Sequence, residues 1–79
     1  MGQAELEHHI LVARRHVELG ERHIARQREI IERLKQQGHD TSSAERLLNT
    51  FEALQALHRM NLQRHLELLG VHDPEAGAH

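Results

Sequence analysis

Apolar residues recur along the first half of the chain with the alternating four- and three-residue spacing of a heptad repeat. The pattern runs from Leu6 to Leu34, and the segment from about residue 3 to residue 37 contains no proline and only one glycine, Gly20. Such a segment predicts one long amphipathic helix. The predicted seam consists of Leu6, Ile10, Ala13, Val17, Gly20, Ile24, Gln27, Ile31 and Leu34.

A second apolar pattern begins after a short polar break at residues 38–41. Gly38 is typical of the left-handed residue that ends a helix, and Asp40, Thr41 or Ser42 can cap the next one. The second helix is predicted over about residues 42–69, with Gly70 as its end. Its seam would be Leu47, Phe51, Leu54, His58, Asn61, His65 and Leu68, widened by Leu48, Leu57, Leu62, Leu66 and Leu69.

A break this short forces the two helices to lie antiparallel, so the predicted fold is an all-α, coiled-coil-like helical hairpin over residues 1–71. Pairing positions whose numbers sum to about 78 places Gly20 opposite His58, and it makes the turn end of the hairpin apolar and its middle polar. Gln27 and Asn61 are polar seam positions that would specify the register. Residues 72–79, which contain Pro74 and Gly77, are expected to form a disordered tail.

The hairpin has more apolar residues than a single pair of helices can cover. A domain of 79 residues is marginal alone, and without cysteine it cannot be stabilised by disulfides. We therefore predict a homodimeric four-helix bundle, against the alternatives of a monomer with scattered surface leucines or a hairpin that binds another helical protein. The predicted oligomer interface is Ile10, Val17, Ile24, Ile31, Leu48, Leu54, Leu57 and Leu62.

Composition and charge exclude several classes of function. The net charge of −2 gives no general attraction to nucleic acid or to an anionic membrane, and the arginines alternate with glutamates. No apolar run is long enough to span a membrane, and residues 1–7 lack the order of a signal peptide. No catalytic motif is present. We expect a cytoplasmic binding module without catalysis and without an organic cofactor.

Histidine is the unusual component, with nine in 79 residues. The His9, His16 and His23 row and the His58, His65 and His72 row each have seven-residue spacing, so histidines from the two helices could converge. His16, His58 and His65 are candidate ligands for zinc or nickel, and His16 would lie level with Leu62. No HExxH motif supports this prediction. The same side chains could instead sense pH, because burial penalises an imidazolium ion, or simply specify the register.

One resemblance spans about residues 8–68. The run from His16 to Gln27, the break from Gly38 to Thr41 and the run from Leu47 to Glu52 resemble a group of short, uncharacterised bacterial proteins that are frequent among α-proteobacteria. The resemblance implies a bacterial cytoplasmic origin and a stand-alone hairpin. It implies no activity, substrate or ligand.

Overall fold

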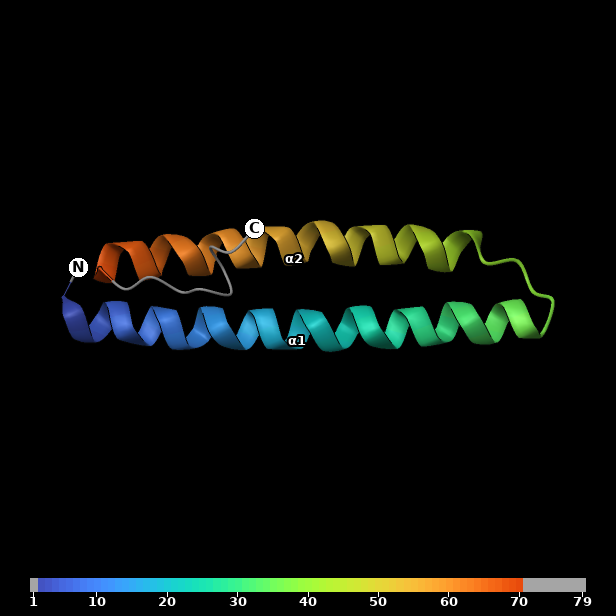
Figure 1. Ribbon diagram of the computed structural model, residues 1–79, viewed down its shortest axis with the longest axis horizontal. Coiled ribbons are helices and arrows are strands. Elements are labelled where there is room, and N and C mark those ends of the chain that lie inside the picture. Colours follow the sequence, from blue (N-terminus) through green and yellow to red (C-terminus); the bar gives the residue numbers. More distant parts are fainter. Residues whose placement is uncertain (1, 71–79) are drawn as a thin grey trace.

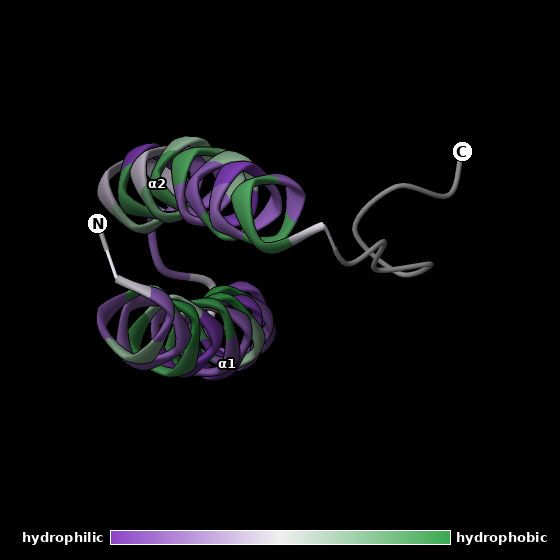
Figure 2. Cartoon of the chain, turned by 90° about the vertical axis from the view of Figure 1, so that its left-hand side faces the viewer, coloured by the Kyte–Doolittle hydropathy of each residue, from purple (hydrophilic) through white to green (hydrophobic). Residues whose placement is uncertain are grey.

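The computed structural model describes residues 2–70, which form two helices joined by one turn. Helix α1 spans Gln3–Gln36 and helix α2 spans Ser42–Leu69. The helices lie antiparallel and side by side in a single layer (Figures 1 and 2). The predicted hairpin is thus confirmed, with helix bounds within one residue of those expected. The predicted disordered tail at residues 72–79 lies outside the described residues.

Gly38 ends α1 as its position in the sequence predicts. Its φ of 73° is left-handed, a conformation that glycine adopts without steric cost. The amide of His39 donates to the Leu34 carbonyl oxygen at 2.9 Å, and the amide of Gly38 donates to the Lys35 carbonyl oxygen at 3.0 Å. These two bonds form a Schellman motif, which satisfies carbonyl groups that the end of the helix would otherwise leave unpaired.

The start of α2 is organised by the carboxylate of Asp40. Its Oδ1 atom accepts hydrogen bonds from the Ser42 hydroxyl at 2.7 Å and from the Ser42 amide at 2.9 Å. Thr41, at the N-cap position, makes no side-chain capping bond. The hydroxyl bond, and after it the amide bond, lower the pKa of the Asp40 carboxyl group below its ordinary value of 3.8, because both favour the ionised form.

We expect Asp40→Ala to lower the Tm at neutral pH, because the first turn of α2 loses its acceptor. The lowered pKa of Asp40 means that the wild-type stabilisation is complete above 3.8 and is lost as the pH falls through the folded-state pKa. The difference in Tm between Asp40→Ala and wild type should therefore narrow as the pH is lowered from about 7 toward about 3. Asp40→Asn is the control, since it keeps an acceptor oxygen that does not titrate. A difference in Tm that is independent of pH would contradict this explanation.

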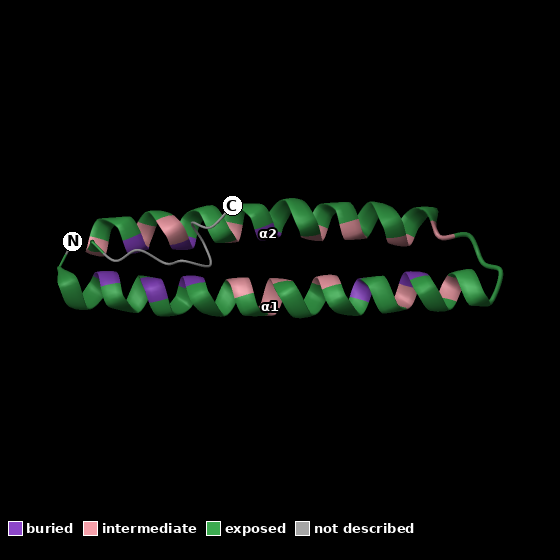
Figure 3. Cartoon of the chain, in the orientation of Figure 1, coloured by how far each residue is buried: buried purple, intermediate pink, exposed green. Residues whose placement is uncertain are grey.

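The main buried cluster lies at the end of the hairpin opposite the turn, where α1 begins and α2 ends. It consists of Leu6, Ile10, Ala13, Leu62 and Leu66, with Val17 and Leu69 packed against it. Figure 3 shows buried positions gathered toward the end away from the turn and fewer near the turn. Ile31 is the buried apolar residue nearest the turn. The predicted pairing does not single out the end opposite the turn as the site of the main buried cluster. In the part of the chain that the structure describes, no large side chain is completely buried, so a single hairpin leaves its core partly open to water.

The predicted seam of α2 alternates between two heptad rows. The structure keeps one of these rows in the seam and replaces the other with the row one residue further along the chain. Phe51, His58 and His65 are half-buried as expected. The positions between them face outward, with Leu47, Leu54 and Leu68 at 44%, 45% and 66% exposure, and Asn61 is exposed as well. Their places in the seam are taken by Leu48, Gln55, Leu62 and Leu69.

Two glutamines cross the helix interface and bind backbone atoms of the opposite helix. Gln27 Nε2 donates to the Ala44 carbonyl oxygen at 2.9 Å, and Gln55 Nε2 donates to the Val17 carbonyl oxygen at 2.8 Å. Both side chains are buried, at 6% and 4% exposure. The prediction for Gln27 as a buried polar seam residue is confirmed. The prediction for Asn61 is wrong, because Gln55 takes that role.

Gly20 is what allows Gln55 to lie between the helices. A Cβ atom at position 20 would overlap the Gln55 side-chain amide. The glycine therefore has a packing reason that offsets its helix-propensity cost of about 1 kcal/mol relative to alanine. Its neighbour is Gln55 and not the predicted His58, which is three residues further from the turn. The predicted register between the two helices is therefore wrong by three residues.

Candidate histidine-lined interaction face

The two sides of the helix interface have opposite chemistry. On one side, Arg59 forms an ion pair with Glu21 at 3.0 Å, and Arg28 forms one with Glu52 at 3.8 Å. These side chains are about half exposed, so each pair adds little stability. Both ion pairs nevertheless join α1 to α2 and give this side of the interface a charged, polar character.

The other side is apolar and rich in histidine, and we call it the histidine flank. Heptad spacing places one row of α1 and one row of α2 next to the seam on this side. A groove between the helices includes residues of both rows, which confirms that both helices contribute to this side. The two rows of the histidine flank are His9, His16, His23 and Ile30 from α1 and Leu47, Leu54, Asn61 and Leu68 from α2.

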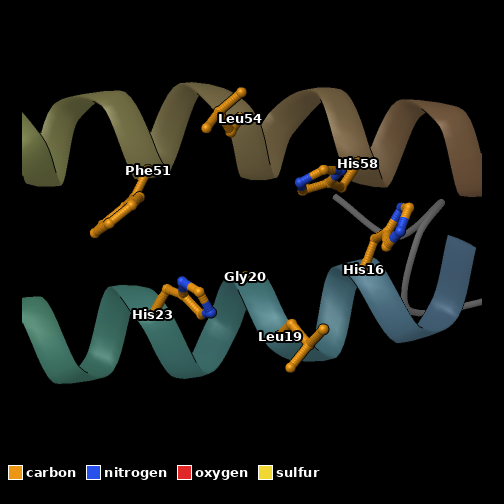
Figure 4. A pocket seen from close by; sticks show the side chains of 7 residues that line it. All are labelled: His16, Leu19, Gly20, His23, Phe51, Leu54 and His58. Atoms are coloured by element: carbon orange, nitrogen blue, oxygen red, sulfur yellow. The ribbon is translucent and has the colours of Figure 1, made fainter.

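A shallow groove of about 360 Å³ lies near the middle of the histidine flank (Figure 4). Gly20 is among its lining residues, and the Gln55 side-chain amide occupies the space that the glycine leaves between the helices. The groove is therefore a consequence of the same packing that admits Gln55. Its lining consists of His16, Leu19, Gly20, His23, Phe51, Leu54 and His58.

Aromatic rings meet in pairs along this side of the interface. The ring centroids of His16 and His58 are 5.4 Å apart, with planes tilted by 50°. The ring of His23 meets the edge of Phe51 at 5.7 Å (Figure 4). Each pair joins a row residue of α1 to a seam residue of α2, so the seven-residue spacing of the histidines produces a ladder.

The third ring pair joins His9 to His65. Their centroids are 5.6 Å apart and their planes are nearly parallel, at 15°. The Nδ1 atom of His65 also lies 2.7 Å from the Asn61 carbonyl oxygen. One ring nitrogen of this pair is therefore engaged with the backbone of its own helix.

The structure brings together two of the three predicted metal ligands. His16 and His58 are neighbours, whereas His65 is paired with His9. His16 is level with His58, not with Leu62 as predicted. Among residues 2–70, no three side chains of the histidine, cysteine, aspartate or glutamate type are placed to hold one metal ion.

Most of the predicted oligomer interface is already covered within the chain. Ile10, Ile31 and Leu62 are buried, and Val17, Ile24 and Leu48 are half-buried. Of the eight residues, only Leu54 and Leu57 remain exposed, at 45% and 59%. The heptad pattern could not separate the contacts within a hairpin from those between hairpins, because both use the same kind of apolar stripe. The exposed large apolar residues are Leu11, Val12, Leu47, Leu54, Leu57, Met60 and Leu68.

No protein-family model, curated protein or solved structure matches this chain. Neither α1 nor α2 is long and apolar enough to cross a membrane. The chemistry of the histidine flank is therefore the observation from which a function can be argued.

Proposed function

We propose that the protein is a self-associating interaction module that pairs with a second copy through the histidine flank to form a four-helix bundle. It acts by binding, as a scaffold or regulator in the cytoplasm, and not by catalysis. The observation that carries the proposal is that four of the exposed large apolar side chains, Leu47, Leu54, Leu57 and Leu68, lie on or beside the histidine flank, whereas the opposite side of the helix interface carries ion pairs.

The energetic reason for pairing is incomplete burial. Leu54 and Leu57 lie three residues apart, which makes them neighbours on the surface of α2, and Leu68 extends the same side at 66% exposure. Burying apolar surface contributes about 25 cal/mol per Å², or about 1.5–3 kcal/mol for a fully covered leucine. A second hairpin laid across the histidine flank would cover these side chains and close the core that one hairpin leaves open.

The absence of permanent charge in both rows favours a second copy as the partner. The histidine flank contains no aspartate, glutamate, lysine or arginine among its eight row residues. A two-fold axis places the same surface on both sides of an interface, so such a surface must tolerate contact with itself. Rows of leucine and histidine without a permanent charge meet that condition, whereas a row with one sign of charge would repel its copy.

Sedimentation equilibrium of the chain and two matched variants tests this proposal. Leu57→Gln places an amide beside the histidine flank, and Met60→Gln makes the same change at 57% exposure on the side of α2 that faces away from α1. We expect Leu57→Gln to raise the dimer dissociation constant at least tenfold, equivalent to about 1.4 kcal/mol, because each dimer loses two buried leucines. Met60→Gln should leave the dissociation constant unchanged.

Two results would overturn the proposal. One is a wild-type chain that keeps the mass of a single copy even at concentrations of about 1 mM, which would limit any self-affinity to about 4 kcal/mol. The other is an equal effect of Leu57→Gln and Met60→Gln on the dissociation constant. A single-copy mass would also favour another helical protein as the occupant of the histidine flank.

A further inference from the structure

We propose that His16 and His58 form half of a binding site for a zinc-type divalent ion, and that a second copy docked on the histidine flank supplies the remaining imidazoles. The inference rests on the proposed self-association and adds a ligand to it. The two histidines come from different helices and line the same groove (Figure 4). An ion held there would bind α1 to α2 and one copy to the other.

The spacing of the two rings fits a shared ion. Zinc binds imidazole nitrogen at about 2.0–2.1 Å in a tetrahedral arrangement, which places two ligand ring centroids about 5 Å apart. The His16 and His58 centroids are 5.4 Å apart. A metal ion lies in the plane of each imidazole that binds it, and planes tilted by 50° can intersect at one ion.

The same test rejects the other histidine pair. The rings of His9 and His65 are stacked at 5.6 Å with only 15° between their planes. Nitrogen lone pairs in two nearly parallel planes do not converge on one ion. The Nδ1 atom of His65 is in addition within hydrogen-bonding distance of the Asn61 carbonyl oxygen. Ring orientation therefore selects His16 and His58 from the histidines of the ladder.

One chain supplies only two of the ligands that a zinc site needs. A structural zinc site takes four ligands, and the described residues bring no third metal-binding side chain to this pair. Both histidines are close to the midpoints of their helices, since α1 spans Gln3–Gln36 and α2 spans Ser42–Leu69. A two-fold axis perpendicular to the helices that overlaps the full length of two hairpins must pass near those midpoints, and an axis parallel to the helices brings equal levels of the two copies together. Either axis therefore brings the partner's groove onto this one.

A two-fold axis can pair the hairpins with their turns at the same end or at opposite ends, and either arrangement adds imidazoles to the site. If the turns lie at the same end, His16 and His58 meet their own equivalents and four imidazoles surround one ion. If the turns lie at opposite ends, the residue brought to His16 and His58 is the second copy's His23, which is seven residues along α1 and lines the same groove. The first arrangement predicts one ion per two chains, and the second predicts two.

The surroundings select the class of ion. The ligands are neutral imidazoles, the two rows of the histidine flank contain no carboxylate, and Leu19, Phe51 and Leu54 form apolar parts of the groove. Imidazole ligands suit zinc, nickel and copper, whereas magnesium and calcium require oxygen ligands. Zinc chloride is therefore the probe for the experiment.

Sedimentation equilibrium and calorimetric titration of the full chain, with zinc or with chelator, test the inference. The comparison uses wild type, His58→Ala and the control His39→Ala, which removes an exposed histidine of the turn. We expect zinc to lower the dimer dissociation constant at least tenfold for wild type and His39→Ala, and to have no effect on His58→Ala. The stoichiometry should be one or two ions per two chains.

The outcomes separate this inference from the proposed self-association. Dimers whose dissociation constant is the same in zinc and in chelator would overturn the metal site and leave self-association intact. A single-copy mass in both conditions would overturn both proposals. Zinc that binds single chains without changing their mass, or binds His58→Ala as tightly as His39→Ala, would place the ion elsewhere and also overturn the site.

Discussion

Replacing Leu66 with alanine is expected to unfold a large fraction of the protein near physiological temperature. Leu66 is 2% exposed and belongs to the cluster that includes Ala13 and Leu62. Truncating a buried leucine costs about 2–5 kcal/mol, because the transfer free energy is lost and a cavity remains. The total stability of a domain this small is about 4–12 kcal/mol at the usual 0.05–0.15 kcal/mol per residue.

The measurement is the free energy of unfolding from urea titration followed by circular dichroism, with the chain concentration held constant because self-association adds to apparent stability. Leu11→Ala is the matched control, since Leu11 is 68% exposed and lies away from the seam. It should change the free energy of unfolding by less than about 0.5 kcal/mol. Equal losses for Leu66→Ala and Leu11→Ala would mean that the cluster at the open end of the hairpin is not its core.

The helix bounds and the turn could be predicted from the sequence because their causes are local. Gly38 adopts the left-handed conformation that ends α1, and Asp40 organises the first turn of α2 through Ser42. Neither feature depends on which face of one helix meets the other. The antiparallel arrangement follows from the shortness of the turn and needs no knowledge of side-chain packing.

The face of α2 could not be predicted, because two rows of residues compete for the seam. The rows beginning at Leu47 and at Leu48 both combine with Phe51 and His58 in heptad spacing. Apolar content does not separate the two rows, because each holds three leucines and one amide side chain, Asn61 in one row and Gln55 in the other. The structure takes the row that contains Gln55, and a reason lies outside α2, in the Val17 carbonyl oxygen that accepts from the Gln55 amide.

The candidate site depends on how α2 is rotated about its own axis and on its register against α1, and the sequence pattern predicts neither. Seven-residue spacing identified the histidine rows, but which rings meet is decided by the register between the helices. A register shorter by three residues pairs His16 with His58 and His9 with His65. The rotation of α2 that places Gln55 in the seam leaves Leu54 exposed beside His16 and His23, where a second copy can reach it. The place of Gln55 in the seam thus accompanies both the observed register and the composition of the histidine flank.

Replacing Gln55 with glutamate is expected to destabilise the protein strongly at neutral pH. The Gln55 side chain is 4% exposed, its Nε2 donates to the Val17 carbonyl oxygen, and its Oε1 has no hydrogen-bond partner. Gln55→Glu would place an ionised carboxylate against that carbonyl, with two acceptors facing each other. An unpaired buried charge of this kind costs about 3–5 kcal/mol.

Acid should restore much of the stability lost in Gln55→Glu, and this distinguishes a charge effect from a packing defect. Burial raises the pKa of the introduced carboxyl group, so its neutral form can donate to the Val17 carbonyl oxygen in place of the amide. Because the folded-state pKa is raised, stability is complete below the unfolded value of about 4.3 and is lost as the pH rises through the folded value. The quantity to measure is the difference in unfolding free energy from wild type between about pH 4 and about pH 8. Asn49→Asp, the same change at an exposed position of α2, should show a small difference that varies little with pH. If the loss in Gln55→Glu is the same at both ends of the pH range, the amide of Gln55 does not hold α2 in its register through Val17.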